Sequence, residues 1–224
     1  KLVRRLNWRG VFFDSGNDSE PVAIVAGYTR SGTTFLGRVL ANLLHARPVH
    51  EPLNPASSPE VSFFNERESR SKLISDRRYN ATLRSVFSKS FKGTRLTNTG
   101  SRLFYDGRVV KVVRANHYAD HLSELFNACP FVVIMRNPYA CVSSRLKLNW
   151  PVPDHSHCFE DIEPYLSQQQ KDMYHRESSV AAKLAISWCL DNLMLLRNRE
   201  RENFLFVHYE SILVRPEEEL TRVL

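Results

Sequence analysis

A short apolar run that leads through a glycine-bearing loop into a helix constrains the fold more than any other part of this sequence. Pro21–Ala26 has the length and composition of a buried strand, and the apolar residues from Phe35 to Leu44 recur at helical spacing. Between them lies Gly27-Tyr-Thr-Arg-Ser-Gly-Thr-Thr34. Such a loop turns successive backbone N–H groups inward, and the helix begins with the positive end of its dipole. The segment therefore predicts a binding site for a doubly charged, phosphate-like anion.

The rest of the chain alternates apolar strand-like runs with helix-like segments. We expect strands at 21–26, 48–51, 108–113, 131–135 and 203–208, and helices at 31–45, 66–91, 118–126, 138–147, 178–199 and from 216 onwards, with loops at 54–59 and 150–159. Continuous apolar strands are typical of sheets that are covered on both faces. The pattern predicts an α/β fold with a central parallel sheet of four or five strands, flanked by helices, and a ligand at the carboxyl ends of the strands.

Composition and charge narrow the class of protein. The 224 residues are 42% hydrophobic and 25% charged, which is ordinary for a globular protein. The chain begins at Lys1 rather than at Met, so we expect a fragment of a longer protein. The last helix, from 216, is short, so we expect a single domain over residues 1–224 that is cut short at its C-terminus. No apolar run approaches the roughly 20 residues of a membrane-spanning helix, so no membrane segment is predicted.

The net charge of +7, from 31 Lys and Arg against 24 Asp and Glu, favours an anionic partner. A polyanion and a small phosphorylated ligand both fit this charge. No zinc-finger spacing and no aromatic RNA-binding signature accompanies the densest basic stretch, at 67–95, so we do not expect nucleic acid as the partner.

The glycine loop differs from that of nucleoside triphosphate enzymes at one position. Its spacing is Gly-x4-Gly, but Thr33 stands where a nucleotide P-loop has the lysine that reaches the β- and γ-phosphates. Arg30 supplies a cation from inside the loop instead. The sequence therefore argues against triphosphate hydrolysis. The alternative is a plain strand-to-helix turn capped by Ser31.

The segment Tyr28-Thr-Arg-Ser-Gly-Thr-Thr-Phe-Leu36 resembles the 5′-phosphosulfate loop of sulfotransferases that use 3′-phosphoadenosine 5′-phosphosulfate (PAPS). It is closest to the Arg-Ser-Gly-Thr form of the carbohydrate and tyrosylprotein enzymes. The resemblance implies a P-loop-like fold, PAPS as donor co-substrate and adenosine 3′,5′-bisphosphate (PAP) as product. The donor-binding residues it implies in this loop are Arg30, Ser31, Gly32, Thr33 and Thr34.

A second motif supports the resemblance. The segment 131–138, Phe-Val-Val-Ile-Met-Arg-Asn-Pro, resembles the strand and helix start at which this family binds the 3′-phosphate. The resemblance assigns that role to Arg136 and to Ser144, eight residues later. A guanidinium pairs well with phosphate oxygens, and a hydroxyl on the next helix adds a donor. With Trp188, Asn192 and 206–210, the resemblance extends over about 22–224.

The candidate general base is Glu51. His50-Glu-Pro-Leu-Asn54 resembles the Glu-Pro element of carbohydrate sulfotransferases, in which the Glu takes the proton of the acceptor hydroxyl while the loop arginine, here Arg30, assists catalysis. The alternative is a carboxylate that merely pairs with Arg30 or Arg47. The histidine of the cytosolic branch is replaced by Val113, so His117 is the second candidate base. Arg114 is either a contact for sulfate or an anionic acceptor, or a solvated cation.

No metal is expected. His117 and His121 flank Asp120 at helical spacing, and His155-Ser-His-Cys158 is a further cluster, but neither has the pattern of an established metal motif. Trp188 is interpreted as core packing. The resemblance implies sulfation of a hydroxyl, most simply of a carbohydrate; a P-loop kinase and a non-catalytic polyanion-binding module are the alternatives. The resemblance implies a cytoplasmic location for a bacterial protein and the Golgi lumen for a eukaryotic protein of the carbohydrate type.

Two features of the family pattern are missing from the sequence. The chain stops before the basic loop that closes over the 3′-phosphate and adenine in this family, and no aromatic residue is assigned to the adenine. The acceptor-facing segments at 54–105 and 150–176 carry no readable motif, although their basic residues favour an anionic or polar acceptor.

Overall fold

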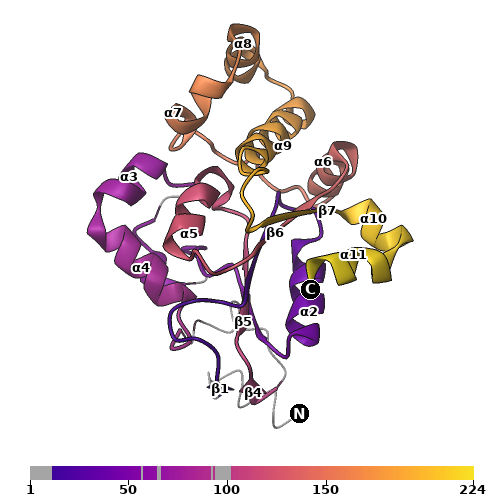
Figure 1. Ribbon diagram of the computed structural model, residues 1–224. Coiled ribbons are helices and arrows are strands. Elements are labelled where there is room, and N and C mark those ends of the chain that lie inside the picture. Colours follow the sequence, from indigo (N-terminus) through magenta and orange to yellow (C-terminus); the bar gives the residue numbers. More distant parts are fainter. Residues whose placement is uncertain (1–11, 57, 65–66, 92, 94–101) are drawn as a thin grey trace.

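A five-stranded parallel sheet forms the centre of the protein (Figure 1). The computed structural model describes residues 12–56, 58–64, 67–91, 93 and 102–224. The strands stand in the order β3-β5-β2-β6-β7 and every neighbouring pair is parallel. Their bounds are Ala23–Ala26 for β2, Arg47–His50 for β3, Arg108–Val112 for β5, Phe131–Met135 for β6 and Phe204–His208 for β7. The predicted α/β class with a central parallel sheet is confirmed.

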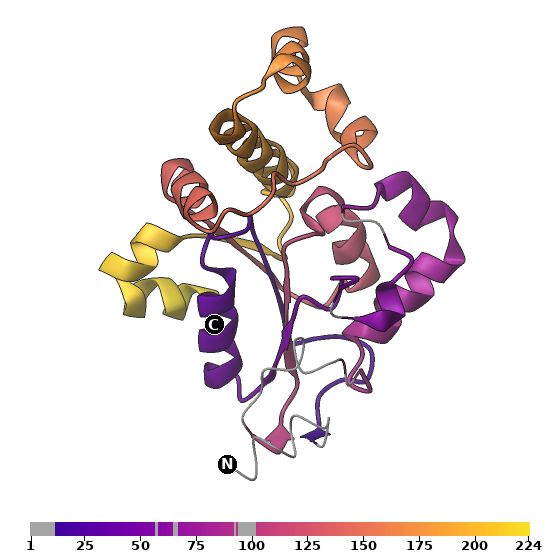
Figure 2. The same ribbon diagram turned by 180° about the vertical axis from the view of Figure 1, so that it is seen from behind.

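Helices cover both faces of the sheet (Figures 1 and 2). On one face lie α2 (Thr33–Leu43), α10 (Tyr209–Val214) and α11 (Pro216–Val223), and on the other α3 (Arg70–Ser75), α4 (Arg77–Phe87) and α5 (Ala119–Leu125). The helices at the top of Figure 1 are α6 (Pro138–Lys147), α7 (Phe159–Ile162), α8 (Gln168–Arg176) and α9 (Val180–Leu196). Within the described ranges, no helix is long and apolar enough to cross a membrane.

The two faces of β2 explain why the strands read as continuous apolar runs. Successive side chains of a strand point to opposite faces. Ile24 packs in the core beneath α4 and α5, and Val25 packs with Leu36 and Leu40 of α2. All four side chains are almost completely buried. Because both faces are covered, neither alternate position can be polar.

The structure differs from the predicted elements in places where local polar contacts or distant pairing decide. The single helix predicted over 66–91 is two helices, because Asp76 has extended backbone and its Oδ1 accepts a hydrogen bond from the amide of Arg78 at 2.8 Å. Position 66 lies outside the described residues. A short 3₁₀ turn, Pro59–Val61, begins at the end of the predicted loop at 54–59.

A second, two-stranded sheet was not predicted. Its strands, β1 (Phe13–Asp14) and β4 (Phe104–Tyr105), are parallel and lie at the lower end of the molecule in Figure 1. The rings of Phe13 and Phe104 stack with 5.2 Å between their centroids. Two-residue strands carry no periodic signal, so sequence reasoning could not find them. The short helices α7, α8 and α10 were also missed.

We expect Leu36→Ala to lower the free energy of unfolding by about 2–5 kcal/mol, because it leaves a cavity between α2 and the sheet. Leu36 is fully buried, whereas Leu43 on the same helix is 49% exposed and provides the matched control. Leu43→Ala should change stability by less than about 0.5 kcal/mol. Urea unfolding of the two variants measures the difference, and equal losses would contradict this account of the core.

Candidate active site

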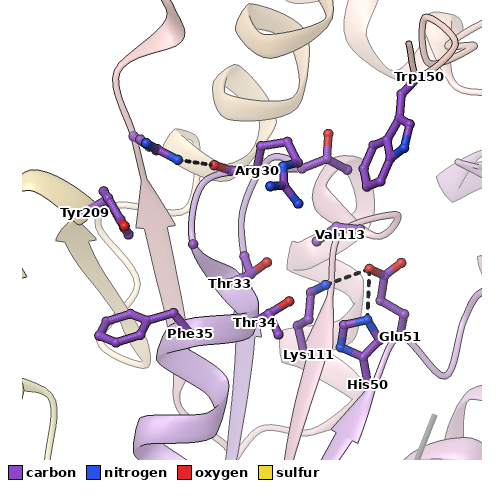
Figure 3. A pocket seen from close by; sticks show the side chains of 13 residues that line it. Arg30, Thr33, Thr34, Phe35, His50, Glu51, Lys111, Val113, Trp150 and Tyr209 are labelled. Atoms are coloured by element: carbon purple, nitrogen blue, oxygen red, sulfur yellow. Dashed lines mark hydrogen bonds and ion pairs between the residues drawn. The ribbon is translucent and has the colours of Figure 1, made fainter. Parts of the chain in front are cut away.

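A cavity of about 370 Å³ opens at the carboxyl edge of the sheet (Figure 3). The glycine loop, the start of α2 and the ends of β3, β5 and β6 enclose it. The lining residues are Thr29, Arg30, Gly32, Thr33, Thr34, Phe35, His50, Glu51, Lys111, Val113, Arg136, Trp150 and Tyr209. Six of the eight predicted site residues are in this set. The remaining two, Ser31 and Ser144, do not line the cavity.

The glycine loop presents the start of α2 to the cavity. Gly32 is the N-cap of α2 with a φ of 97°, and no side chain in the described part of the chain caps this end. The first amides of a helix have no partner within it, so those of Gly32 to Phe35 are available to an anion. Gly32 is also required by space, because a Cβ there would lie 2.5 Å from Cδ2 of Tyr209. The loop bends sharply at Arg30, whose φ is 72°.

Ser31 does not direct its side chain into the cavity. It is fully buried, and its Oγ lies 3.8 Å from Sγ of Cys141. Its backbone amide donates to the carbonyl oxygen of Tyr28 at 3.1 Å. The hydroxyl and the amide therefore both hold the loop in shape, and Gly32, not Ser31, occupies the N-cap position. The alternative reading of a turn capped by Ser31 is wrong.

Arg30, Arg136 and Ser144 form one cluster, although they come from three elements. Nε of Arg30 donates to Oγ of Ser144 at 2.9 Å, and Nη1 of Arg136 donates to the carbonyl oxygen of Arg30 at 3.1 Å. The guanidinium of Arg136 lies 4.4 Å from the ring centre of Tyr209. The two arginines thus reach the cavity from neighbouring loops, and Ser144 acts on it through Arg30.

Trp188 has a second role besides packing. Its indole Nε1 donates to the backbone carbonyl of Arg136 at 3.2 Å. The side chain of Asn192, one turn further along α9, donates back to the carbonyl of Trp188 at 2.7 Å. Helix α9 therefore holds the end of β6 from which Arg136 projects, a function that helical periodicity alone could not reveal.

Glu51 lies at the end of β3 in an ion-pair cluster (Figure 3). Its Oε1 lies 2.6 Å from Nζ of Lys111 and 3.7 Å from Nε2 of His50, and its Oε2 pairs with Arg114. The partners named in the alternative, Arg30 and Arg47, are not the ones found. Glu51 also has a left-handed φ of 46°. A non-glycine residue held in this conformation stores strain, which is common at functional sites.

The charges around Glu51 keep it ionised. Burial alone would raise the pKa of its carboxyl group, but the charges of Lys111 and Arg114 outweigh burial and hold that pKa below its usual range. Burial and the charge of Lys111 lower the pKa of His50, so His50 is mostly neutral at pH 7. At neutral pH the cavity therefore holds one carboxylate and one neutral imidazole.

Lys111 is the functional candidate that sequence reasoning left without a role. Its side chain is 9% exposed, and burial lowers its pKa while Glu51 opposes that shift. A signal was present, because Lys111 interrupts an otherwise apolar strand between two pairs of valines. Buried charges of this kind are rare unless they are paired or used.

Aromatic residues complete the cavity. Phe35 and Tyr209 meet edge to face with 6.5 Å between ring centroids. Trp150 stands on the other side of the cavity in Figure 3, with the guanidinium carbon of Arg30 5.5 Å from its ring centre. Tyr209 directly follows β7. Its position at the end of a predicted strand could have identified it as a site residue from the sequence, but no role was predicted for it.

The remaining histidine candidates lie away from the cavity. His117 is fully buried with its Nε2 against a backbone carbonyl, and burial lowers its pKa to about 4. His121 Nε2 lies 2.8 Å from Oδ1 of Asn80, and His155 Nε2 lies 3.0 Å from Oδ1 of Asp191. In the described ranges, no three His, Cys, Asp or Glu side chains gather into a metal-binding group.

Comparison with known proteins identifies the family of the fold and the motifs. The profile of the sulfotransferase family matches residues 21–224. The nodulation protein NoeE of Sinorhizobium fredii (strain NBRC 101917 / NGR234) is 28% identical over 218 residues, covering 91% of this chain and 49% of NoeE, so the chain spans about half the length of this relative. A sulfotransferase domain from the curacin biosynthetic pathway has a similar fold, with a TM-score of 0.51 and 15% identity over 92% of this chain and 73% of that domain.

The Glu51 cluster predicts a defined pH dependence of stability. Because the folded-state pKa of Glu51 is below the ordinary value of 4.5, its ion pairs stabilise the fold fully above that pH, and the contribution is lost as the pH falls toward the folded pKa. Glu51→Gln should therefore be less stable than wild type at pH 6, and the gap should shrink between pH 4.5 and 3.5.

Urea unfolding at each pH measures this gap. The control is Glu200→Gln, which removes a surface pair with Arg199 and should have little effect at any pH. A gap for Glu51→Gln that is constant from pH 6 to 3.5 would mean that the cluster does not hold the carboxylate ionised.

Proposed function

The chain belongs to the sulfotransferase family, and we propose that it transfers a sulfuryl group from PAPS to a hydroxyl group, most simply of a carbohydrate. One observation carries this proposal. The uncapped start of α2, three cations (Arg30, Lys111 and Arg136) and the ionised carboxylate of Glu51 meet in one cavity. A multiply charged donor needs the helix start and the cations, and proton removal from a hydroxyl needs the carboxylate.

The donor is proposed to lie between the glycine loop and β7. Its 5′-phosphosulfate would be bound by Arg30 and by the amides at the start of α2, with the Thr33 and Thr34 hydroxyl groups beside them. Its 3′-phosphate would pair with Arg136. Phe35 and Tyr209 provide the aromatic surface that an adenine requires. The hydroxyl of Ser144 would contribute by fixing Arg30, and Ser31 by fixing the loop.

The proposed reaction is an in-line displacement at sulfur. The acceptor oxygen forms a bond to sulfur while the bond from sulfur to the phosphate oxygen breaks, and the bonding electrons leave with PAP. Glu51 takes the proton of the acceptor hydroxyl. Arg30, Lys111 and the helix amides stabilise the charge that develops on the leaving phosphate. These fixed groups supply the electrostatics, so the scheme contains no metal.

Lys111 connects the donor to the base. Its charge helps to hold the pKa of Glu51 low, which makes the carboxylate a weak proton acceptor. A phosphosulfate beside Lys111 adds negative charge next to this pair. That charge favours the protonated form of Glu51 and so raises its proton affinity when the donor is present.

The alternatives are tested with ligands. Thermal shifts are compared for PAP, for ATP with magnesium and for heparin, because a ligand that binds only the native state raises its apparent stability. We expect PAP to give the largest shift. A larger shift with ATP and magnesium would favour a kinase, and a response to heparin alone would favour a polyanion-binding module.

Arg136→Ala should weaken PAP binding by about 2–3 kcal/mol, the range for a charge-assisted hydrogen bond to phosphate. Ser144→Ala should cost less, because Ser144 holds Arg30 and carries no charge. Arg199→Ala, an exposed arginine outside the cavity, is the control. Calorimetric titration measures each affinity. Equal affinities of the Arg136 and Arg199 variants would remove Arg136 from the donor site.

Glu51→Gln should lower turnover by about 100-fold or more with PAP affinity largely retained, since the amide keeps the shape but cannot take the proton. His117→Ala should lower turnover far less, because His117 lies outside the cavity. Transfer of labelled sulfate from PAPS to oligosaccharide acceptors, with and without a chelator, measures both. Near-normal turnover of Glu51→Gln would assign the base elsewhere.

A further inference from the structure

A second cavity, of about 530 Å³, adjoins the first and shares part of its wall. Thr29, His50, Glu51 and Trp150 line both cavities. The residues that line only the second are Asn54, Arg114, Arg145, Pro151, Val152 and Pro153. A molecule in the second cavity would therefore meet the donor at Glu51, the residue proposed to accept the proton.

The lining of this cavity combines an apolar segment with polar side chains. Residues 150–153, Trp-Pro-Val-Pro, make one wall that is apolar and, with two prolines, stiff. The amide of Asn54 and the guanidinium groups of Arg114 and Arg145 also line this cavity. A sugar ring has the matching character, with apolar C–H faces and a rim of hydroxyl groups that hydrogen-bond to amides and guanidinium groups.

The apolar wall is held near both ends, by a side chain of α6 and by a histidine of the same loop. At its start, Arg145 of α6 donates to the carbonyl oxygen of Pro151 and, at 2.5 Å, to Oγ1 of Thr29. Just beyond its end, the ring of His155 lies with Nδ1 3.3 Å from the carbonyl oxygen of Pro153. The wall is thus joined to the glycine loop on one side and to His155 on the other.

His155 is itself anchored in a buried ion pair. Its Nε2 lies 3.0 Å from Oδ1 of Asp191 on α9, and Nη2 of Arg67 lies 3.1 Å from Oδ2 of the same carboxylate. The three side chains are 1–2% exposed. Burial would raise the pKa of Asp191, but the charge of Arg67 and the contact with His155 together outweigh it and keep the carboxylate ionised. Breaking a buried ion pair is strongly destabilising, so the pair with Arg67 fixes the carboxylate of Asp191. The contact with this fixed carboxylate holds His155 in place.

We propose that the second cavity binds the acceptor as a saccharide, that residues 150–153 form the wall that determines which acceptor fits, and that His155 positions this wall from Asp191. The inference rests on the proposed function, since an acceptor is meaningful only if the first cavity takes the sulfuryl donor. It adds a location for the acceptor, a specificity-determining segment and a positioning residue that touches neither donor nor acceptor.

The first test fills the second cavity without altering the donor site. Val152 lines only the second cavity, so Val152→Trp should raise the KM for tetrasaccharide acceptors at least 10-fold, with PAP affinity within 2-fold of wild type. Cellotetraose, chitotetraose and tetragalacturonate are the probes. The control is Val180→Trp, at an exposed position of α9 that lines neither cavity. Asn54→Ala, which removes a polar group from the lining of the second cavity, gives a second variant if Val152→Trp folds poorly.

The second test concerns positioning. His155→Ala should raise the acceptor KM several-fold with smaller changes in kcat and in PAP affinity, because only the wall loses its support. His155→Gln keeps a donor for Asp191 and should restore much of the acceptor affinity. A loss of thermal stability alone, with acceptor KM unchanged in the His155 variants, would reduce His155 to a structural residue and overturn its positioning role.

The outcomes separate this inference from the proposed function. A wild-type protein that binds no PAP would overturn the proposed function and this inference with it. A protein that binds PAP and transfers sulfate, but whose acceptor KM is the same in wild type, Val152→Trp and Asn54→Ala, would overturn the inference alone. A Val152→Trp variant that loses PAP affinity as strongly as acceptor affinity would also overturn it, because the two cavities would then not be separate sites.

Discussion

Parallel pairing of β2 with β5 and β6 is the constraint on which the site depends. The register places Ala26 beside Val112 and Val133, so β2 and β5 end at the same level and β6 ends two residues further along. The pairing of β3 with β5 sets His50 beside Lys111 in the same way. Loops that leave these strands therefore begin at one edge, and residues far apart in the sequence share one cavity there. The chemistry of the site follows from backbone hydrogen bonds that involve none of its side chains.

The same edge explains why charged groups are tolerated so close to the core. Lys111 belongs to a buried strand, and its charge is matched by Glu51, which Arg114 pairs from the other side. Removing one of these three side chains would leave buried charge without its opposite partner, which is destabilising. The cluster therefore stabilises the fold only as a set, and a ligand that draws on one of its charges changes the properties of all of them.

Sequence reasoning succeeded where the signal was local. The glycine loop and Arg136 each follow a recognisable apolar strand, Glu51 belongs to the short strand predicted at 48–51, and the parallel sheet follows from the alternation of strands and helices; the roles of these residues stay predictions. Reasoning failed where distant contacts decide. The partners of Glu51 come from another strand, and the break at Asp76 depends on one side-chain cap within an otherwise helical pattern. Trp150, in a loop that carries no readable motif, could be recognised only once the fold brings it to the cavity.

Helix α9 gives the two cavities a common frame. Trp188 holds the carbonyl of Arg136 beside the first cavity, and Asp191, three residues later, holds His155 beside the second. Residues three apart on a helix point in similar directions, so one helix positions both Arg136 and His155. Variation along α9 would disturb the two cavities together, whereas variation in residues 150–153 would alter one of them. Under the proposed acceptor assignment, divergence among related proteins toward new acceptors should accumulate in residues 150–153, while α9 changes slowly.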